Sequence, residues 1–433
     1  MKIKRVEIVG FALLIAGLVA TLFFAHQDTF FTLFFGMSLA FSGYFILTLC
    51  SLNGLSINHL IIIGILIRLT AIFNVPSLTD DFYRFFWDGW LSASGISPYL
   101  FTPRELIQEI TPLPGLFAKL NSQDYYSVYP PLLQFFFHLA YLLSKGSLAS
   151  FIFWTKLPIW LAETLTLILI PKILCALGQN EKLAKWYFFN PLIIVELLGN
   201  IHYEGLAITG LCLGIYGIFY KKSLLSVLGV SFAVGIKLVP LITLPFFLLL
   251  WNWKNRILMS VQLMVFFKDL FDLEEMTHFF TSLNLYFQKF EFNGSVYFFS
   301  REISRLIIGY NPIAYLGPGL QIIVVVGIIF LVYKWLFEKG RRKQAGIEMI
   351  FFICLLYYFF STTVHPWYLG IPVFLGVFLP YRFIHLWSWL IFLSYFHYNE
   401  GGYDESFWVP VIEYVGIWIL MLIEIKKRWE YKS

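Results

Sequence analysis

The sequence predicts an all-α fold, a polytopic transmembrane bundle of about 14 crossings. Hydrophobic residues make up 59% of the 433-residue chain and charged residues only 13%, far from the composition of a soluble domain. Apolar segments recur from Val6 to Ile425, and no polar stretch between them is long enough for a soluble domain. The chain is therefore expected to form one integral membrane domain, residues 1–433.

Three apolar segments open the chain, at residues 6–25, 30–50 and 56–73. The first is longer than the apolar core of a signal peptide, about 7–15 residues, and no A-x-A-like cleavage site follows it, so it is read as a membrane helix. The basic start, MKIKR, is expected to stay in the cytoplasm. Three crossings then put residue 74 and its successors on the external side.

A non-apolar stretch follows at residues 76–128 and is predicted to be the first external loop, carrying interfacial helices. The next apolar stretch, 129–145, is short enough for a re-entrant or interfacial segment. If it crossed the membrane, the basic run EKGRRK (338–343) and the C-terminus would lie outside, which the positive-inside rule disfavours. The sequence thus predicts a bacterial inner-membrane protein with both termini cytoplasmic and a second large external loop at 269–317.

The later helices complete the bundle, and several are too short to span a bilayer without protein around their ends. They are expected at about residues 150–174, 186–199, 205–220, 223–236, 238–251, 256–268, 318–336, 346–362, 367–380, 383–397 and 408–425.

Ionisable residues in apolar surroundings are costly, so each is a candidate functional group. In TDDFYRFFWDGW, Asp81, Arg84 and Asp88 share one helical face. A structural interpretation is an interfacial helix capped by Asp80 with ion pairs along one side. A functional interpretation is a carboxylate that deprotonates a hydroxyl nucleophile, or holds a metal ion that does so.

Three further external sites interrupt apolar sequence. GNIHYEG holds Asn200, His202 and Glu204 in a turn that needs only one or two polar groups. Lys237, in AVGIKLVPL, could snorkel to the interface, pair with an acid or bind an anion. His365, in STTVHPWYLG, is either a structural residue between two helices or a functional one that donates to a phosphate or stacks near a sugar.

Two charged residues, Arg68 and Glu163, lie inside predicted helices, where structural ion pairing is the favoured interpretation. The net charge of +5 requires no nucleic-acid partner.

Six motifs follow one another along the chain: TDDFYRFFWDGWLSASGISPYLFTP, VYPPLLQFFF, FNPLIIVELLGNIHYEG, GIKLVPL, FEFNGSVYFFSR and VHPWYLG. In this order they resemble the motifs of bacterial GT-C glycosyltransferases, in particular the mannosyltransferases that use polyprenyl-phosphate mannose. The resemblance covers about residues 60–400. It implies a GT-C-like bundle and an inverting transfer of a hexose, here mannose, from a polyprenyl-phosphate sugar to an acceptor hydroxyl.

The resemblance also implies roles for individual residues. The catalytic carboxylate of the first external loop corresponds to Asp81 or Asp80, and Phe82 stands where a D-x-D motif would carry its second acid. Lys237, Arg84 and His365 would then hold the donor phosphate, because cations stabilise the charge that develops on a leaving phosphate. Substrate-binding residues carried over from the motifs are Arg84, Asp88, Tyr129, Asn200, His202, Glu204, Lys237, His365 and Trp367.

The expected partners are the lipid bilayer, a polyprenyl-phosphate sugar and an acceptor that is a glycolipid, a glycan or a protein. No cofactor is required by the pattern, and a divalent cation, Mg²⁺ or Mn²⁺, at Asp80 and Asp81 is left open. Two alternatives compete. A transporter or flippase of a lipid-linked saccharide would place its charges at the bilayer midplane and often shows internal repeats. An O-antigen-polymerase- or ligase-like enzyme would centre on a late external loop.

Overall fold

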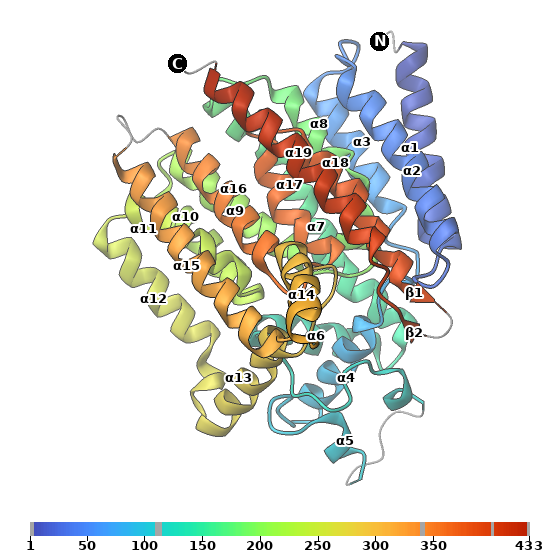
Figure 1. The fold of residues 1–433 in the computed structure, drawn as a ribbon, viewed down its shortest axis with the longest axis vertical. Helices are drawn as coiled ribbons and strands as arrows, with labels where there is room; N and C mark the ends of the chain where they lie inside the picture. The colour runs from blue at the N-terminus through green and yellow to red at the C-terminus, as the bar shows by residue number, and fades with distance from the viewer. Residues whose placement is uncertain (1–3, 109–114, 338–342, 400–401, 431–433) are drawn as a thin grey trace.

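The computed structural model describes residues 4–108, 115–337, 343–399 and 402–430, and nearly all its regular structure is helical (Figure 1). The α-helices of the first half are α1 (Arg5–Phe24), α2 (Phe30–Leu49), α3 (Ile57–Leu69), α4 (Asp81–Ala93), α5 (Pro103–Leu106), α6 (Pro131–Ser144), α7 (Leu148–Ala176), α8 (Lys185–Phe188) and α9 (Glu204–Phe219). Those of the second half are α10 (Ser223–Ile236), α11 (Leu244–Leu250), α12 (Trp253–Phe266), α13 (Leu273–Gln288), α14 (Ser295–Ile308), α15 (Ile313–Phe337), α16 (Lys343–Phe360), α17 (Gly370–Gly376), α18 (Phe383–Leu390) and α19 (Trp408–Glu430).

Shorter elements join these helices. The 3₁₀ segments are η1 (Phe117–Lys119), η2 (Glu181–Ala184), η4 (Val239–Thr243), η5 (Lys268–Phe271), η6 (Pro366–Leu369) and η7 (Ile391–His397), and η3 (Ile193–Gly199) is a π-helix. Strands β1 (Tyr398–Asn399) and β2 (Gly402–Tyr403) pair antiparallel, with Tyr398 opposite Tyr403.

The polytopic all-α fold is confirmed. Among the described residues, α1, α2, α7, α15, α16 and α19 are six helices long and apolar enough to cross a membrane. The pair η3 and α9, bent by 113°, would bring the number to seven, and shorter apolar helices lie at 57–69, 131–144, 223–236 and 239–250. Large apolar side chains point outward along α15, where only 17% of the spanning window is buried, as expected for a surface solvated by lipid. The total of about 14 crossings, which includes the short segments, stays a prediction.

Three helices expected to be continuous are divided into shorter elements, and a proline, which lacks the N–H that a helix interior needs, lies in or next to each. Pro191 separates α8 from η3, Pro240 is the second residue of η4 ahead of α11, and Pro366 is the first residue of η6 ahead of α17. The expected helix at 383–397 is likewise divided, into α18 and η7. Irregular backbone links the helices at residues 200–203, 237–238 and 361–365, where several of the candidate polar residues lie.

The two ends of the bundle differ. Both chain ends lie at the top of Figure 1, whereas α4, α5, α6, α13 and the β1–β2 hairpin lie at the bottom. Helix α6, the segment expected to be re-entrant, packs on α4, with the rings of Phe85 and Phe137 stacked 4.6 Å apart. The re-entrant assignment stays a prediction, as do the two external loops; residues 109–114 of the first loop lie outside the described residues, as do 338–342 and 431–433 of the basic runs.

Helices α1 and α2 form a tight hairpin because glycines let their backbones touch. A Cβ on Gly17 would lie 2.2 Å from the backbone nitrogen of Ala40, and one on Gly43 would lie 2.4 Å from that of Leu14. The α1–α2 loop lies away from the two chain ends, toward the end of the bundle that carries α4 (Figure 1).

Candidate active site

Helix α4 presents the acidic motif of the first loop. Asp80 is its N-cap residue, as predicted, but its side chain makes no capping hydrogen bond. Along the buried face, Arg84 Nε donates to Asp88 Oδ1 at 2.7 Å. The second oxygen of Asp88 accepts hydrogen bonds from Ser127 Oγ at 2.7 Å and Gln134 Nε2 at 2.8 Å. Both Asp88 oxygens are thus occupied by the protein, and the predicted substrate contact of Asp88 is not supported by this geometry.

Arg84 also holds the loop. Its Nη1 donates to the carbonyl oxygens of Ser122 at 3.0 Å and Tyr125 at 2.9 Å. Its Nη2 is buried and has no hydrogen-bond partner among the described residues. Arg84 therefore ties α4 to the loop at residues 122–125, and its predicted role in holding the donor phosphate stays a prediction.

Asp81 begins α4 and is the carboxylate on which the other charges act. Its Oδ1 accepts a hydrogen bond from Asn121 Nδ2 at 2.9 Å. Burial raises the pKa of Asp81; the Asn121 hydrogen bond and the Lys237 ammonium lower it, and the carboxylates of Asp80 and Glu204 raise it further. Asp80 is more exposed, and its pKa is raised by partial burial against an opposing hydrogen bond with Gln27.

Lys237 and Glu204 form an ion pair between the end of α10 and the start of α9. The Lys237 side chain stays 30% exposed and its ammonium lies 5.6 Å from the centre of the Tyr368 ring, a cation–π contact. Glu204 Oε2 is buried without a hydrogen-bond partner among the residues described. Of the possibilities that the sequence left open for Lys237, the structure therefore shows pairing with an acid.

An aromatic stack closes the site from the other half of the chain. The His202 ring lies 3.7 Å from that of Trp367, which lies 4.4 Å from that of His365, which in turn lies 4.5 Å from that of Phe292. Burial, together with the Lys237 charge, lowers the pKa of His365 to about 3. His365 is therefore a neutral hydrogen-bonding group at pH 7 and not the cation that was expected.

The turn that carries His202 is strained. Ile201 has φ +58° although it is β-branched and fully buried, a conformation such residues rarely adopt. It is held because the backbone N–H groups of Asn200 and His202 donate to the carbonyl oxygens of Val195 and Leu197.

Asn200 positions the acidic segment. Its side-chain oxygen accepts hydrogen bonds from the backbone N–H groups of Ser77 and Leu78, both at 3.2 Å. Its Nδ2 donates to the carbonyl oxygen of Val195 at 3.1 Å. Asn200 thus fastens the chain just before Asp80 to the turn that carries His202.

Tyr129 was also predicted to bind substrate, and its surroundings are mainly structural. Its carbonyl oxygen accepts from the Tyr99 hydroxyl at 2.5 Å, and its ring meets Phe85 and Phe137 edge-on.

Two site residues were not singled out from the sequence. Glu196, fully buried in the π-helix η3, accepts a hydrogen bond from the Tyr395 hydroxyl at 3.0 Å and lies 3.4 Å from His202 Nε2. Glu196 is the one charged residue in the apolar run WYFFNPLIIVELLGN. A charged residue that interrupts apolar sequence is the signal by which Lys237 was selected, and the same signal could have identified Glu196. Asn121 carried no comparable signal, because it stands in a polar loop.

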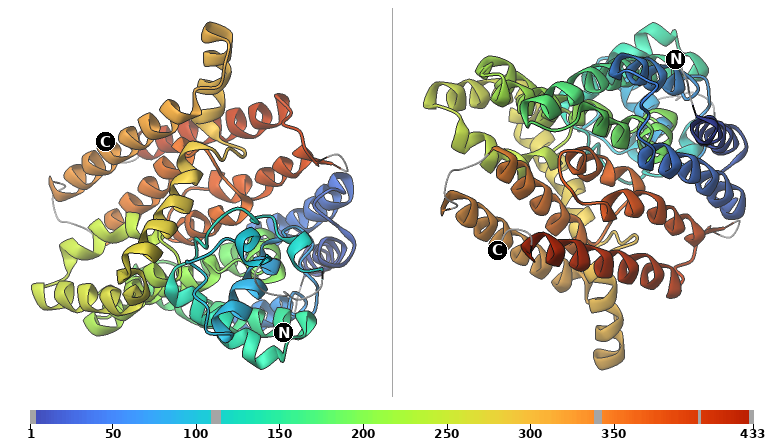
Figure 2. Two further views of the ribbon diagram at one scale, coloured as in Figure 1. Left: turned by 90° about the horizontal axis from the view of Figure 1, so that it is seen from below. Right: turned by 90° about the horizontal axis from the view of Figure 1, so that it is seen from above.

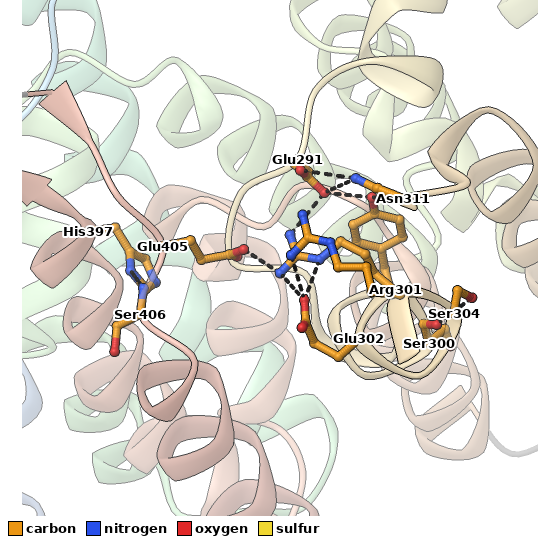
Figure 3. Close-up of polar contacts among 11 residues, drawn as sticks. Glu291, Ser300, Arg301, Glu302, Ser304, Asn311, His397, Glu405 and Ser406 are labelled. Atoms are coloured by element: carbon orange, nitrogen blue, oxygen red, sulfur yellow. Dashed lines mark hydrogen bonds and ion pairs between the residues drawn. The ribbon is translucent and has the colours of Figure 1, made fainter. Parts of the chain in front are cut away.

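A separate polar cluster surrounds Arg301 on α14 (Figure 3). Its guanidinium is 2% exposed and pairs with Glu291 at 3.0 Å, Glu302 at 2.9 Å and Glu405. Asn311 donates to Glu291 as well. Since Glu405 follows β2, this cluster ties the hairpin segment to α14.

The bundle and its convergent carboxylates, lysine and stacked histidines define a polytopic membrane protein with an enzyme-like polar site at one end. A family model described as "Alpha-(1->6)-mannopyranosyltransferase, N-terminal domain" matches residues 12–253, more than half of the chain. The chain belongs to this mannosyltransferase family, which confirms the resemblance drawn from its motifs. The matched region contains Asp81, Glu204 and Lys237 and ends before the stacked His365 and Trp367.

One curated relative is the alpha-(1->6)-mannopyranosyltransferase A of Mycobacterium tuberculosis, 23% identical over 195 residues. The match covers 42% of this chain and 35% of that protein, so this chain spans about a third of the relative's length. No solved structure matches this chain.

Proposed function

We propose that this chain is a GT-C-type mannosyltransferase that moves mannose, with inversion, from polyprenyl-phosphate mannose to an acceptor hydroxyl at the outer face of the inner membrane. The observation that carries the proposal is the shared environment of Asp81, Glu204 and Lys237. A base for the acceptor and a cation for the leaving phosphate are the two groups that this reaction needs.

The reaction proceeds as a single displacement. The acceptor oxygen attacks C1 of mannose while the bond from C1 to the phosphate oxygen breaks, and polyprenyl phosphate leaves. The carboxylate of Asp81 takes the acceptor proton. Burial makes this carboxylate more basic than a free aspartate, and the Asn121 hydrogen bond keeps it oriented.

Lys237 faces the departing phosphate, and Glu204 holds its ammonium in place until the donor binds. The neutral His365 adds a hydrogen-bonding group near Lys237. The Trp367 ring, stacked between two histidines, forms a rigid wall against which a sugar ring can rest.

The membrane side is inferred from charge. The N-terminal basic residues favour the cytoplasm, and α4 lies at the end of the bundle opposite both termini (Figure 1). At the outer face nucleotide sugars are absent, which supports a lipid-linked donor.

The candidate metal ligands fit an ion poorly. Among the described residues no group of three or more His, Cys, Asp or Glu is arranged to hold a metal ion. Asp81 already bonds Asn121 and Asp80 bonds Gln27. No step of the proposal uses a metal.

The test is an assay of purified protein with a panel of polyprenyl-phosphate sugars, with and without EDTA. We expect the wild type to transfer mannose and the Asp81→Asn variant to be inactive while still folded. Transfer at the wild-type rate by both Asp80→Asn and Asp81→Asn would refute the assigned base. Movement of a labelled lipid-linked sugar across the vesicle membrane, without transfer of the sugar to an acceptor, would favour the flippase.

A further inference from the structure

A groove of about 610 Å³ lies beside the proposed active site, between the α1–α2 loop and the β1–β2 hairpin. Its lining residues are Asp28, Thr29, Phe30, Phe31, Thr32, Phe396, Tyr398, Asp404 and Ser406. Figure 1 shows the loop end of α2 next to the hairpin, and Figure 2 shows the same neighbourhood from below and above. Its volume lies within the range of small-molecule sites, about 300–1,000 Å³.

The groove borders the segment that carries the proposed catalytic carboxylates. Gln27, next to the lining residue Asp28, hydrogen-bonds the side chain of Asp80, and its backbone N–H donates to the Ser77 carbonyl oxygen at 3.1 Å. On the opposite wall, Tyr398 is close enough to Asp81 and Asp80 for both carboxylates to raise the pKa of its hydroxyl, in addition to its burial. A molecule in the groove can therefore present a hydroxyl to these carboxylates.

The charge of the groove excludes the donor phosphate. Its described lining contains two carboxylates, Asp28 and Asp404, and neither lysine nor arginine. The cation of the active site is Lys237 at the end of α10, and α10 and the hairpin lie on opposite sides of the bundle in Figure 1. A phosphate would be repelled by the groove and attracted to Lys237.

The remaining side chains suit a sugar. Thr32 and Ser406 supply hydroxyls that both donate and accept, and the carboxylates accept from sugar hydroxyls. The Thr29 hydroxyl is already engaged with the His26 backbone, which it uses to hold the rim of the groove. Phe30 and Phe396 pack edge-to-face, 5.0 Å apart, and form an apolar wall that can cover the C–H face of a pyranose.

We infer that this groove binds the acceptor, and that the acceptor is an uncharged, hydroxyl-rich saccharide entering between the α1–α2 loop and the hairpin. This inference rests on the proposed function, because it assigns the second substrate of the same reaction. Donor and acceptor then approach Asp81 from opposite sides. Lys237 holds the donor phosphate, and Asp28 and Asp404 bind the neutral glycan.

Two phenylalanines one turn apart on α2 make a matched test. Phe31 lines the groove and is 79% exposed, whereas Phe35 is 68% exposed and does not line it. With the full-length protein and α-(1→6)-mannobiose, we expect Phe31→Ala to weaken binding and raise the acceptor KM about tenfold. The donor KM should stay unchanged, and Phe35→Ala should behave as wild type. A rise of the donor KM instead would mean that the groove holds the lipid donor, and equal behaviour of both variants would overturn the inference.

The charge argument has its own test, in which direct binding is measured without any donor. The wild type should bind methyl α-mannoside more tightly than mannose 6-phosphate, and Asp28→Asn should narrow that difference. An unchanged preference would refute the role of the carboxylates. A parallel binding measurement with octyl α-mannoside distinguishes a glycolipid from a free glycan as the natural acceptor. A protein that binds mannobiose in a Phe31-dependent way yet transfers no mannose would refute the proposed function and not the groove.

Discussion

Two acid–base pairs sit among the apolar helices, and their surroundings differ. We refer to Arg68–Glu163 as the closed pair and to Lys237–Glu204 as the open pair. In the closed pair, Arg68 Nε and Nη2 donate to Glu163 Oε2 at 3.1 and 3.0 Å, and Nη1 donates to the carbonyl oxygens of Gly64 and Phe188. The Tyr187 hydroxyl donates to the other Glu163 oxygen at 2.7 Å.

The open pair lacks this completeness. Glu204 Oε2 is buried without a hydrogen-bond partner among the described residues, and Lys237 is partly exposed. Its neighbours, Asp81 and the His202–Trp367–His365 stack, leave polar atoms facing the same region. The comparison teaches that a buried pair in which every polar atom has a partner stabilises the fold, whereas a pair with an unpartnered atom can use it to bind a substrate.

The largest effect is expected at Asp81. Asp81→Asn should lower the rate of transfer by about 10³-fold, since it removes the base and keeps the shape. The rate is measured with saturating donor and acceptor. Asp124→Asn, in the same loop but exposed and paired with Arg104, is the matched control and should keep the wild-type rate. A comparable loss in both variants would contradict a specific role for Asp81.

Breaking the closed pair should affect stability and not chemistry. Glu163→Met leaves the Arg68 charge buried and alone, which should cost about 3–5 kcal/mol of unfolding free energy. The double variant Arg68→Met/Glu163→Met should regain most of that loss. Thermal unfolding in one detergent measures both, and a double variant as unstable as the single one would contradict the unpaired Arg68 charge as the cause of the loss.

Breaking the open pair should do the reverse. Lys237→Met should lower the transfer rate about 100-fold, because the leaving phosphate loses its cation. Its effect on thermal unfolding should be smaller than that of Glu163→Met, since water already solvates part of the lysine. A rate near wild type would remove Lys237 from the phosphate site.

The smallest effect is expected at Asn200, whose side-chain oxygen holds the backbone just before Asp80. Asn200→Ala should lower kcat about tenfold, because the backbone ahead of Asp80 loses two hydrogen bonds. The pH dependence of the rate should keep its wild-type shape. A shifted pH profile would indicate a direct part in proton transfer.

The sequence was sufficient to predict the all-α membrane fold and the gathering of Asp81, Glu204, Lys237 and His365. Each interrupts apolar sequence, and the positive-inside rule assigned them all to one end of the bundle. The partner of each group could not be predicted. Lys237 and Glu204 are 33 positions apart in the sequence, and Arg68 and Glu163 are 95 positions apart. Both pairings depend on how the helices pack.

Other features escaped the sequence for a different reason. The sequence predicted a catalytic role for Asp81 and a substrate contact for Asp88, which share a helical face, but Asp88 is enclosed by Ser127 and Gln134 whereas Lys237 and Glu204 act on Asp81. Helical periodicity assigns residues to a face, but the loop that folds over that face determines which of them remain accessible. His365 was expected to be a cation because its burial could not be known.

The central claim, that Asp81 and Lys237 share one pocket, is tested most directly by the pH dependence of kcat/KM in the wild type and in Lys237→Met. Asp81 acts only when ionised, so activity falls as the pH drops through its pKa. The Lys237 ammonium lowers that pKa. Its removal should move the acidic limb of the profile to higher pH, and a limb that stays in place or moves to lower pH would contradict the account.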